Sequence, residues 1–174
     1  MLYKFHFDFS DIDRGLYEQL EFRTAQHPSE SPAYLLTRAL SYALSYRPGL
    51  EFSPGGLADP DAPALQCAGA HGAIDLWIEI GNPSNKKMHK ASKAAREVVV
   101  YTYKNPELLL AQMRTGEIYR AGEIKIYAFD SKFISDLEAL LEKNNRWSVL
   151  YQQGQLDIDT GHGRAVCEVR IASS

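Results

Sequence analysis

The sequence has few cysteines and no long hydrophobic run. Among its 174 residues, Cys67 and Cys167 are the two cysteines, and neither belongs to a CxxC motif or a Cys/His cluster. We therefore expect neither a zinc site nor a disulfide framework. No apolar run approaches the ~20 residues of a membrane-spanning helix, and the alternation of aromatic and polar residues over 3–9 is unlike a signal peptide. The sequence predicts a soluble, cytosolic protein without membrane contact.

The sequence also lacks an excess of positive charge. Its 19 lysines and arginines are outnumbered by 22 aspartates and glutamates, which gives a formal net charge of −3. Attraction of the whole molecule to nucleic acid is therefore not expected, and only a local basic patch could provide it. No Ser/His/Asp arrangement and no glycine-rich phosphate loop is present. Repeats and domain boundaries are absent, and a chain of 174 residues with 45% hydrophobic residues fits one domain over 1–174.

Hydrophobic periodicity predicts an α+β fold, in which a central mixed sheet is flanked by helices and antiparallel strands lie near both ends. Strands are expected at 3–9, 16–24, 50–53, 64–68, 73–81, 97–103 and 124–129, and a small antiparallel meander over 147–171. Helices are expected at 30–46, with Ser29 as the cap, at 84–96, at 105–113 and from Asp130 onward. The strand at 97–103 follows a helix, which indicates a crossover to a parallel neighbour of 73–81.

Glu79 lies in the middle of the most apolar strand of the chain. In 73–81, Leu76, Ile78 and Ile80 fall on one face and Glu79 falls on the other, which is the period of two of a half-buried strand. A buried carboxylate costs several kcal/mol unless a cation, a proton or a metal compensates it. Its compensation is either a structural salt bridge, with a basic neighbour such as Arg38 or Lys90, or a functional site.

A basic helix follows this strand directly and carries five cations, Lys86, Lys87, Lys90, Lys93 and Arg96. The plain interpretation is a solvated helix face. The alternative is a local surface for nucleic acid, since the helix starts beside the end of the strand that carries Glu79. Trp77, two residues before Glu79, is interpreted as packing under a helix rather than as a stacking platform.

The expected pairing of two neighbouring strands predicts a second acid near Glu79. If 64–68 and 73–81 pair about a turn at 69–72, opposed positions sum to roughly 141, so that Asp61 lies opposite Ile80 and diagonal to Glu79. Two carboxylates there can share a hard cation such as Mg²⁺. Asp75 is four residues from Glu79, roughly 13 Å along a strand, and is interpreted as structural or as a substrate contact.

Pro60-Asp61, seventeen intervening residues and Glu79-Ile-Gly81, followed by a lysine-bearing helix, resemble the PD-(D/E)XK nuclease superfamily. More narrowly, nearly the whole chain, from His27-Pro-Ser-Glu30 to Gly72-Ala-Ile-Asp-Leu-Trp-Ile-Glu-Ile-Gly-Asn-Pro83, resembles the YaeQ family of bacterial proteins. The resemblance implies a restriction-endonuclease-like core, with Asp61 and Glu79 as ligands of Mg²⁺. The superfamily lysine two residues after the glutamate is replaced by Gly81. Lys90, or Lys87, would then supply the ammonium from the following helix.

Two functions follow as hypotheses. The first is a Mg²⁺-dependent nuclease, in which Lys86, Lys93 and Arg96 contact the nucleic acid. The second is a catalytically inactive nuclease-like fold that binds nucleic acid or protein. Glu30 and Asp75 are accessory candidates, although the positive first turn of its helix explains Glu30 adequately.

Overall fold

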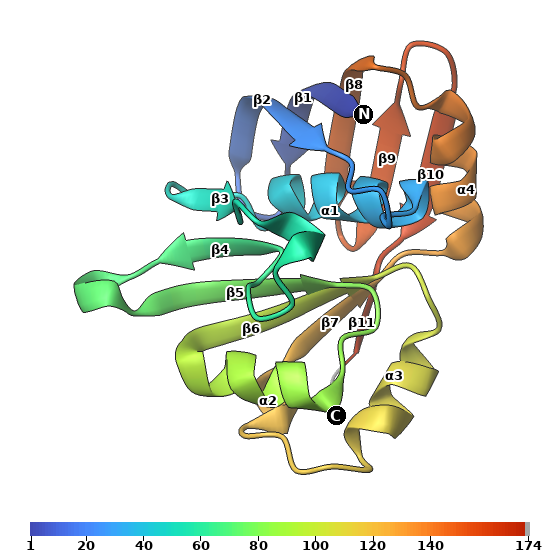
Figure 1. Cartoon of the computed structure of the whole chain (residues 1–174). Helices are drawn as coiled ribbons and strands as arrows, with labels where there is room; N and C mark the ends of the chain where they lie inside the picture. The colour runs from blue at the N-terminus through green and yellow to red at the C-terminus, as the bar shows by residue number, and fades with distance from the viewer. Residues whose placement is uncertain (173–174) are drawn as a thin grey trace.

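The computed structural model describes residues 1–172 and has two mixed sheets with helices between and outside them (Figure 1). The first sheet has the order β10-β9-β8-β1-β2, with bounds β1 (Leu2–Asp11), β2 (Leu16–Ala25), β8 (Asn144–Gln152), β9 (Gln155–Asp159) and β10 (Arg164–Glu168). The second has the order β11-β7-β6-β5-β4-β3, with bounds β3 (Leu50–Phe52), β4 (Leu65–Ala68), β5 (Ile74–Ile80), β6 (Ala95–Thr102), β7 (Lys125–Ala128) and β11 (Arg170–Ala172). The four α-helices are α1 (Pro32–Leu44), α2 (Asn85–Ala94), α3 (Pro106–Met113) and α4 (Ser131–Leu140).

The first sheet is built on the aromatic alternation of the N-terminal strand. Phe5, Phe7 and Phe9 are fully buried and face α1, because residues of one parity point to one side of a strand. β1 pairs antiparallel with β2 and parallel with β8, whose Trp147 lies opposite Phe7 and stacks on it. The N-terminal hairpin and the C-terminal meander, predicted separately, therefore form one sheet.

The helix α1 lies between the two sheets (Figure 1). Its buried leucines and alanines join one core with Phe5 and Phe7 of the first sheet and with Leu76 and Ile78 of the second. A second core forms on the other face of the second sheet, where Trp77 of β5 packs with Met88 of α2. The strand β5 is thus covered on both faces, whereas the sequence predicted a half-buried strand.

The central position of β5 is confirmed: it pairs parallel with β6 and antiparallel with β4. The expected helices cover the sheet, with α1 on the side of Leu76, Ile78 and Ile80 and α2 on the opposite side. The crossover from β5 through α2 to a parallel β6 is the arrangement predicted from the sequence. Within residues 1–172, no helix is both long and apolar enough to cross a membrane.

Several expected boundaries are wrong. The helix α1 is capped by Ser31, whose hydroxyl accepts from the N–H of Tyr34, and not by Ser29. The helix α2 ends at Ala94 and β6 begins at the next residue, so Arg96 lies on a strand. The C-terminal segment is only partly the expected meander, because β11 leaves it and pairs with β7 of the second sheet.

The predicted hairpin register is wrong by two residues. Leu65 pairs with Ile78 and Cys67 with Leu76, and the register shifts at Ala68. The short helical turn Ala70–Gly72 makes this connection longer than a tight hairpin turn. Asp61 consequently lies in the turn before β4, and not on a strand opposite Ile80.

Candidate functional site

Glu79 is buried at the C-terminal half of β5, where only 2% of the residue is exposed. Its Oε1 accepts a hydrogen bond of 2.7 Å from the indole N–H of Trp77. Its Oε2 lies 3.3 Å from the ammonium of Lys87. Each carboxylate oxygen therefore has a donor, and the charge has a counter-ion.

Local sequence explains this geometry. Trp77 and Glu79 are two residues apart on a strand, so their side chains leave the same face. Ser84 caps α2 through a 3.1 Å hydrogen bond from the N–H of Lys87 to its hydroxyl. This cap begins the helix beside the end of β5. The side chain of Lys87, which leaves the first turn, is therefore able to reach back to Glu79.

The electrostatics of the site are those of a buried, compensated acid. Burial raises the pKa of Glu79, while the Lys87 ammonium and the Trp77 N–H lower it. Burial also raises the pKa of Tyr34 on α1, and the Glu79 carboxylate raises it further. The Glu79 charge therefore acts on Tyr34 of α1 as well as on the basic helix α2.

Asp61 reaches the same helix from the loop before β4. Its carboxylate lies 3.2 Å from the ammonium of Lys90, and its side chain is 78% exposed. Lys87 and Lys90 are one helical turn apart, so the two acids meet neighbouring lysines on one ridge of α2. The expected contact between a lysine of this helix and one of these acids is confirmed, with Lys87 on Glu79 and Lys90 on Asp61. Their catalytic roles stay a prediction.

The remaining candidates lie around this ridge or away from it. Lys86 and Lys93 are exposed on α2 and form no ion pair within the described residues. Arg96 lies on β6, where its guanidinium is 3.9 Å from Asp75. Asp75 is therefore beside Arg96 at the far end of β5 and not beside Glu79, as the strand spacing predicted.

Glu30 is buried, and it does not occupy the first turn of α1. Its carboxylate accepts from Nε and Nη2 of Arg38 at 3.0 and 3.1 Å, and from the N–H of His27 at 3.1 Å. The helix-dipole interpretation of Glu30 is therefore wrong. Because Arg38 is bound to Glu30, Lys87 and not Arg38 or Lys90 pairs with Glu79.

The side chains present do not fit a divalent cation as they are arranged. A shared Mg²⁺ would need one oxygen of Glu79 and one of Asp61, but Lys87 and Trp77 occupy both oxygens of Glu79 and Lys90 contacts Asp61. In the part of the chain that the structure describes, no three His, Cys, Asp or Glu side chains gather as a metal site. A cation is present at Glu79, and it is the ammonium of Lys87.

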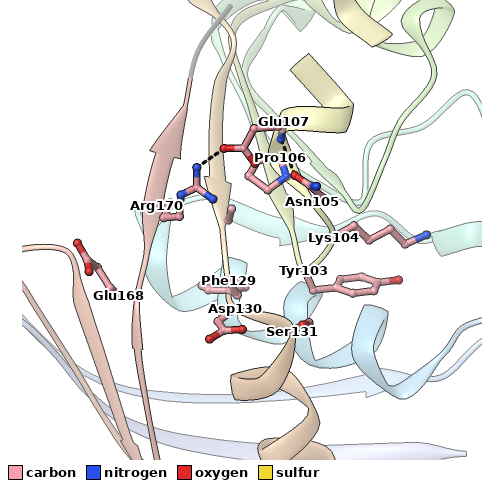
Figure 2. A pocket seen from close by; sticks show the side chains of 11 residues that line it. Tyr103, Lys104, Asn105, Pro106, Glu107, Phe129, Asp130, Ser131, Glu168 and Arg170 are labelled. Atoms are coloured by element: carbon pink, nitrogen blue, oxygen red, sulfur yellow. Dashed lines mark hydrogen bonds and ion pairs between the residues drawn. The ribbon is translucent and has the colours of Figure 1, made fainter. Parts of the chain in front are cut away.

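Sequence reasoning missed two features. The first is the hydrogen bond of Trp77 to Glu79, which the spacing of two residues on a strand could have indicated. The second is a cavity of about 580 Å³ at the ends of β6 and β7, where the starts of α3 and α4 meet (Figure 2). An ion pair between Glu107 and Arg170 crosses its rim. None of the predicted site residues lines this cavity.

Known proteins share this architecture over almost the whole chain. Crystal structures of YaeQ proteins from Xanthomonas axonopodis pv. citri and Pseudomonas syringae superpose with TM-scores of 0.90 and 0.89, each over 99% of this chain. The aligned regions span 98% of the Xanthomonas chain and 96% of the Pseudomonas chain, at 30% and 24% sequence identity respectively. The second of these likenesses concerns the fold alone.

Sequence comparison gives the same result. The uncharacterized protein YaeQ of Escherichia coli K12 is 26% identical over 154 residues, which cover 88% of this chain and 84% of that protein. The corresponding Salmonella typhi protein is 24% identical over 156 residues, or 89% and 86% of the two chains. The family model of the YaeQ protein matches residues 1–169. The chain therefore belongs to the YaeQ family.

Proposed function

We propose that this chain binds the phosphate backbone of nucleic acid through α2 and does not cleave it, as a non-catalytic member of the PD-(D/E)XK superfamily. One observation carries the proposal: the ammonium of Lys87 lies 3.3 Å from the glutamate oxygen that would otherwise bind a metal. The pair neutralises the buried charge of Glu79, which would be costly if left unpaired, and it leaves no open position for a catalytic cation.

The order of elements supports the superfamily assignment. Helix α1 precedes the antiparallel strands β3, β4 and β5, and α2 then leads to the parallel strand β6. The two acids of the motif, Asp61 and Glu79, lie at one end of this hairpin and both face α2. This is the arrangement expected for a restriction-endonuclease-like core.

The conformation at Gly81 explains why the motif lysine is missing. Gly81 has φ +83°, and its N–H donates to the carbonyl of Tyr101 as the chain leaves β5. A residue with a side chain adopts such a φ only with strain of about 1–2 kcal/mol. A lysine is therefore disfavoured at this position, and the ammonium comes from α2 instead.

The exposed face of α2 fits a polyanion. Lys86, Lys90 and Lys93 are exposed on it, and only Lys90 has an acidic partner among the described residues. Lysines at this spacing contact phosphates without reading sequence. Since the chain has a net charge of −3, the expected binding is weak, local and strongly dependent on salt.

The test is fluorescence anisotropy with a labelled duplex over a range of salt concentrations. Because each phosphate contact contributes about one unit of slope in log K against log salt, the double variant Lys86→Gln/Lys93→Gln should lower the slope by about two. Lys143→Gln, at an exposed lysine directly before β8, is the matched control and should change nothing. Equal effects of both variants, or no binding by the wild type, would contradict the proposal.

A second candidate is a Mg²⁺-dependent nuclease. The contacts of Glu79 and Asp61 with the neighbouring lysines Lys87 and Lys90 of α2 favour it. In that case Lys90→Ala and Glu79→Gln would each abolish cleavage while the fold persists. DNA and RNA substrates incubated with Mg²⁺ or Mn²⁺ test this directly. Cleavage that is lost in both variants supports the nuclease, and inactive wild-type protein on every substrate leaves the binding function.

A further inference from the structure

A second cavity, of about 440 Å³, lies beside α1, near the end of β2 and the end of β3. It is bounded by the end of β2, the loop into α1 and the segment after β3 (Figure 1). Its lining includes Arg23, His27, Arg38, Phe52, Ser53 and Leu57. No residue of α2 lines it.

Arg38 lies in the wall of this cavity, and one of its guanidinium nitrogens has no hydrogen-bond partner within the described residues. Its Nε and Nη2 donate to Glu30, and Nη2 also donates to the carbonyl of Ala25. Nη1 makes no hydrogen bond within the described residues and is not among the buried atoms without a partner. The guanidinium lies 5.7 Å from the centre of the Phe52 ring, within the range of a cation–π contact. Glu30 neutralises Arg38 and accepts three hydrogen bonds, two from Arg38 and one from the N–H of His27.

His27 also lines the cavity. Its Nδ1 lies 3.1 Å from the backbone nitrogen of Ser29 and 2.7 Å from the Ser29 hydroxyl. Nδ1 is therefore engaged with Ser29, whereas Nε2 makes no hydrogen bond within the described residues.

Two further groups lack partners. Arg23 is exposed at the end of β2 and forms no ion pair within residues 1–172. The hydroxyl of Ser53 is buried in the wall, and it has no hydrogen-bond partner among the described residues. A buried hydroxyl without a partner is uncommon in folded proteins, and a hydroxyl hydrogen rotates to suit an incoming acceptor.

We propose that this cavity binds a small phosphate monoester. The polar groups come from β2, the loop before α1, α1 itself and the segment after β3. Two guanidinium groups and one carboxylate, that of Glu30, line the cavity and leave an excess of positive charge. Guanidinium groups match phosphate oxygens. Phe52 and Leu57 supply apolar wall for the organic part, and the volume is within the range of small-molecule sites.

Isothermal titration with inorganic phosphate, acetate, adenosine and adenosine 5′-monophosphate tests the proposal. The expected order is adenosine 5′-monophosphate tightest, inorganic phosphate next, and acetate and adenosine at least tenfold weaker than the monophosphate. Absence of phosphate binding at millimolar concentration overturns the proposal. Acetate as tight as phosphate, or adenosine as tight as its monophosphate, does so too.

Variants locate the site. Arg23→Gln should weaken the monophosphate about tenfold with an unchanged melting temperature, since Arg23 is exposed and unpaired within the described residues. Ser53→Ala should weaken it by a smaller factor without affecting the fold. Arg146→Gln, an exposed arginine on the outer face of the first sheet, is the control. Binding that is unchanged in Arg23→Gln contradicts the assignment. The Lys86→Gln/Lys93→Gln variant should bind the monophosphate normally, which separates this site from duplex binding.

Discussion

At the scale of single residues, the Glu79 carboxylate is stabilised by two different donors. The Trp77 N–H is fixed by the strand, and the Lys87 ammonium comes from the next helix. Breaking a buried ion pair on one side typically costs about 3–5 kcal/mol. Because the Lys87 side chain is 26% exposed, water screens this pair in part, and the expected cost is smaller.

Lys87→Met should therefore lower the free energy of unfolding by about 1–3 kcal/mol, because Glu79 would remain buried without its counter-ion. Urea unfolding followed by circular dichroism measures this change. Lys93→Met, at an exposed position on the same helix, should stay within about 0.5 kcal/mol of the wild type. The double variant Lys87→Met/Glu79→Gln should recover most of the loss, and additive losses would show that the two residues are not coupled.

The pH dependence of stability tests the same acid. Burial raises the pKa of Glu79 above its ordinary value of 4.5, so the folded protein binds this proton more tightly than the unfolded chain. Its contribution to stability is then greatest below pH 4.5 and falls as pH rises through the raised pKa. Replacement by glutamine removes this dependence. The stability of Glu79→Gln relative to the wild type should rise between about pH 4 and pH 7, and a fall over this interval would refute the raised pKa.

Sequence reasoning found the acids, the lysines and their contact, but not which lysine pairs with which acid. Burial of Glu79 followed from the apolar strand, and the reach of Lys87 or Lys90 followed from the helix that begins directly after it. The partner of Arg38 did not follow, because the chain turns at His27 and buries Glu30 before α1 begins. Such a contact depends on tertiary packing, which residue spacing does not encode.

At the scale of elements, periodicity predicted strands and helices better than it predicted where they end. The apolar residues Met88, Ala91, Ala95 and Val98 fit one helical seam, yet the last two lie on β6. The helix and the strand both bury them in the core beneath α2, so burial of these residues does not distinguish a helix from a strand. The register of β4 and β5 failed for a different reason, since the irregularity at Ala68 has no signal in a count of residues.

The start of α2 is the element that positions the site. Ser84→Ala removes the hydroxyl that accepts from the N–H of Lys87, and loss of such a cap costs about 0.5–2 kcal/mol. Thermal unfolding should show this loss. Ser84→Asp retains an acceptor at the cap and should keep stability close to that of the wild type, whereas an equal loss in both variants would show that the loss does not come from the missing acceptor.

At the scale of the whole molecule, α1 joins two sheets into one structure. The inner core contains side chains from both sheets, and the outer core shares the second sheet with it. The general class, a mixed fold with β5 in the centre of its sheet, followed from the sequence. The division into two sheets did not, because the parallel pairing of β1 with β8 joins segments from opposite ends of the chain.

Such a shared core predicts a single cooperative unfolding transition for the domain. Trp147 lies in the inner core and Trp77 in the outer core, so single-tryptophan variants report on each separately. Trp77→Phe and Trp147→Phe should each show fluorescence and far-ultraviolet circular dichroism transitions that coincide. Two separate midpoints would instead indicate that the sheets unfold as independent units.

The occupancy of Glu79 by Lys87 is the centre of this account, and titration of the protein with Mn²⁺, followed by electron paramagnetic resonance, tests it most directly. We expect no saturable Mn²⁺ binding in wild-type protein, because both oxygens of Glu79 already have donors. We expect binding to appear only when Lys87→Met frees one of these oxygens. Stoichiometric Mn²⁺ binding by the wild type that disappears in Glu79→Gln would contradict the account.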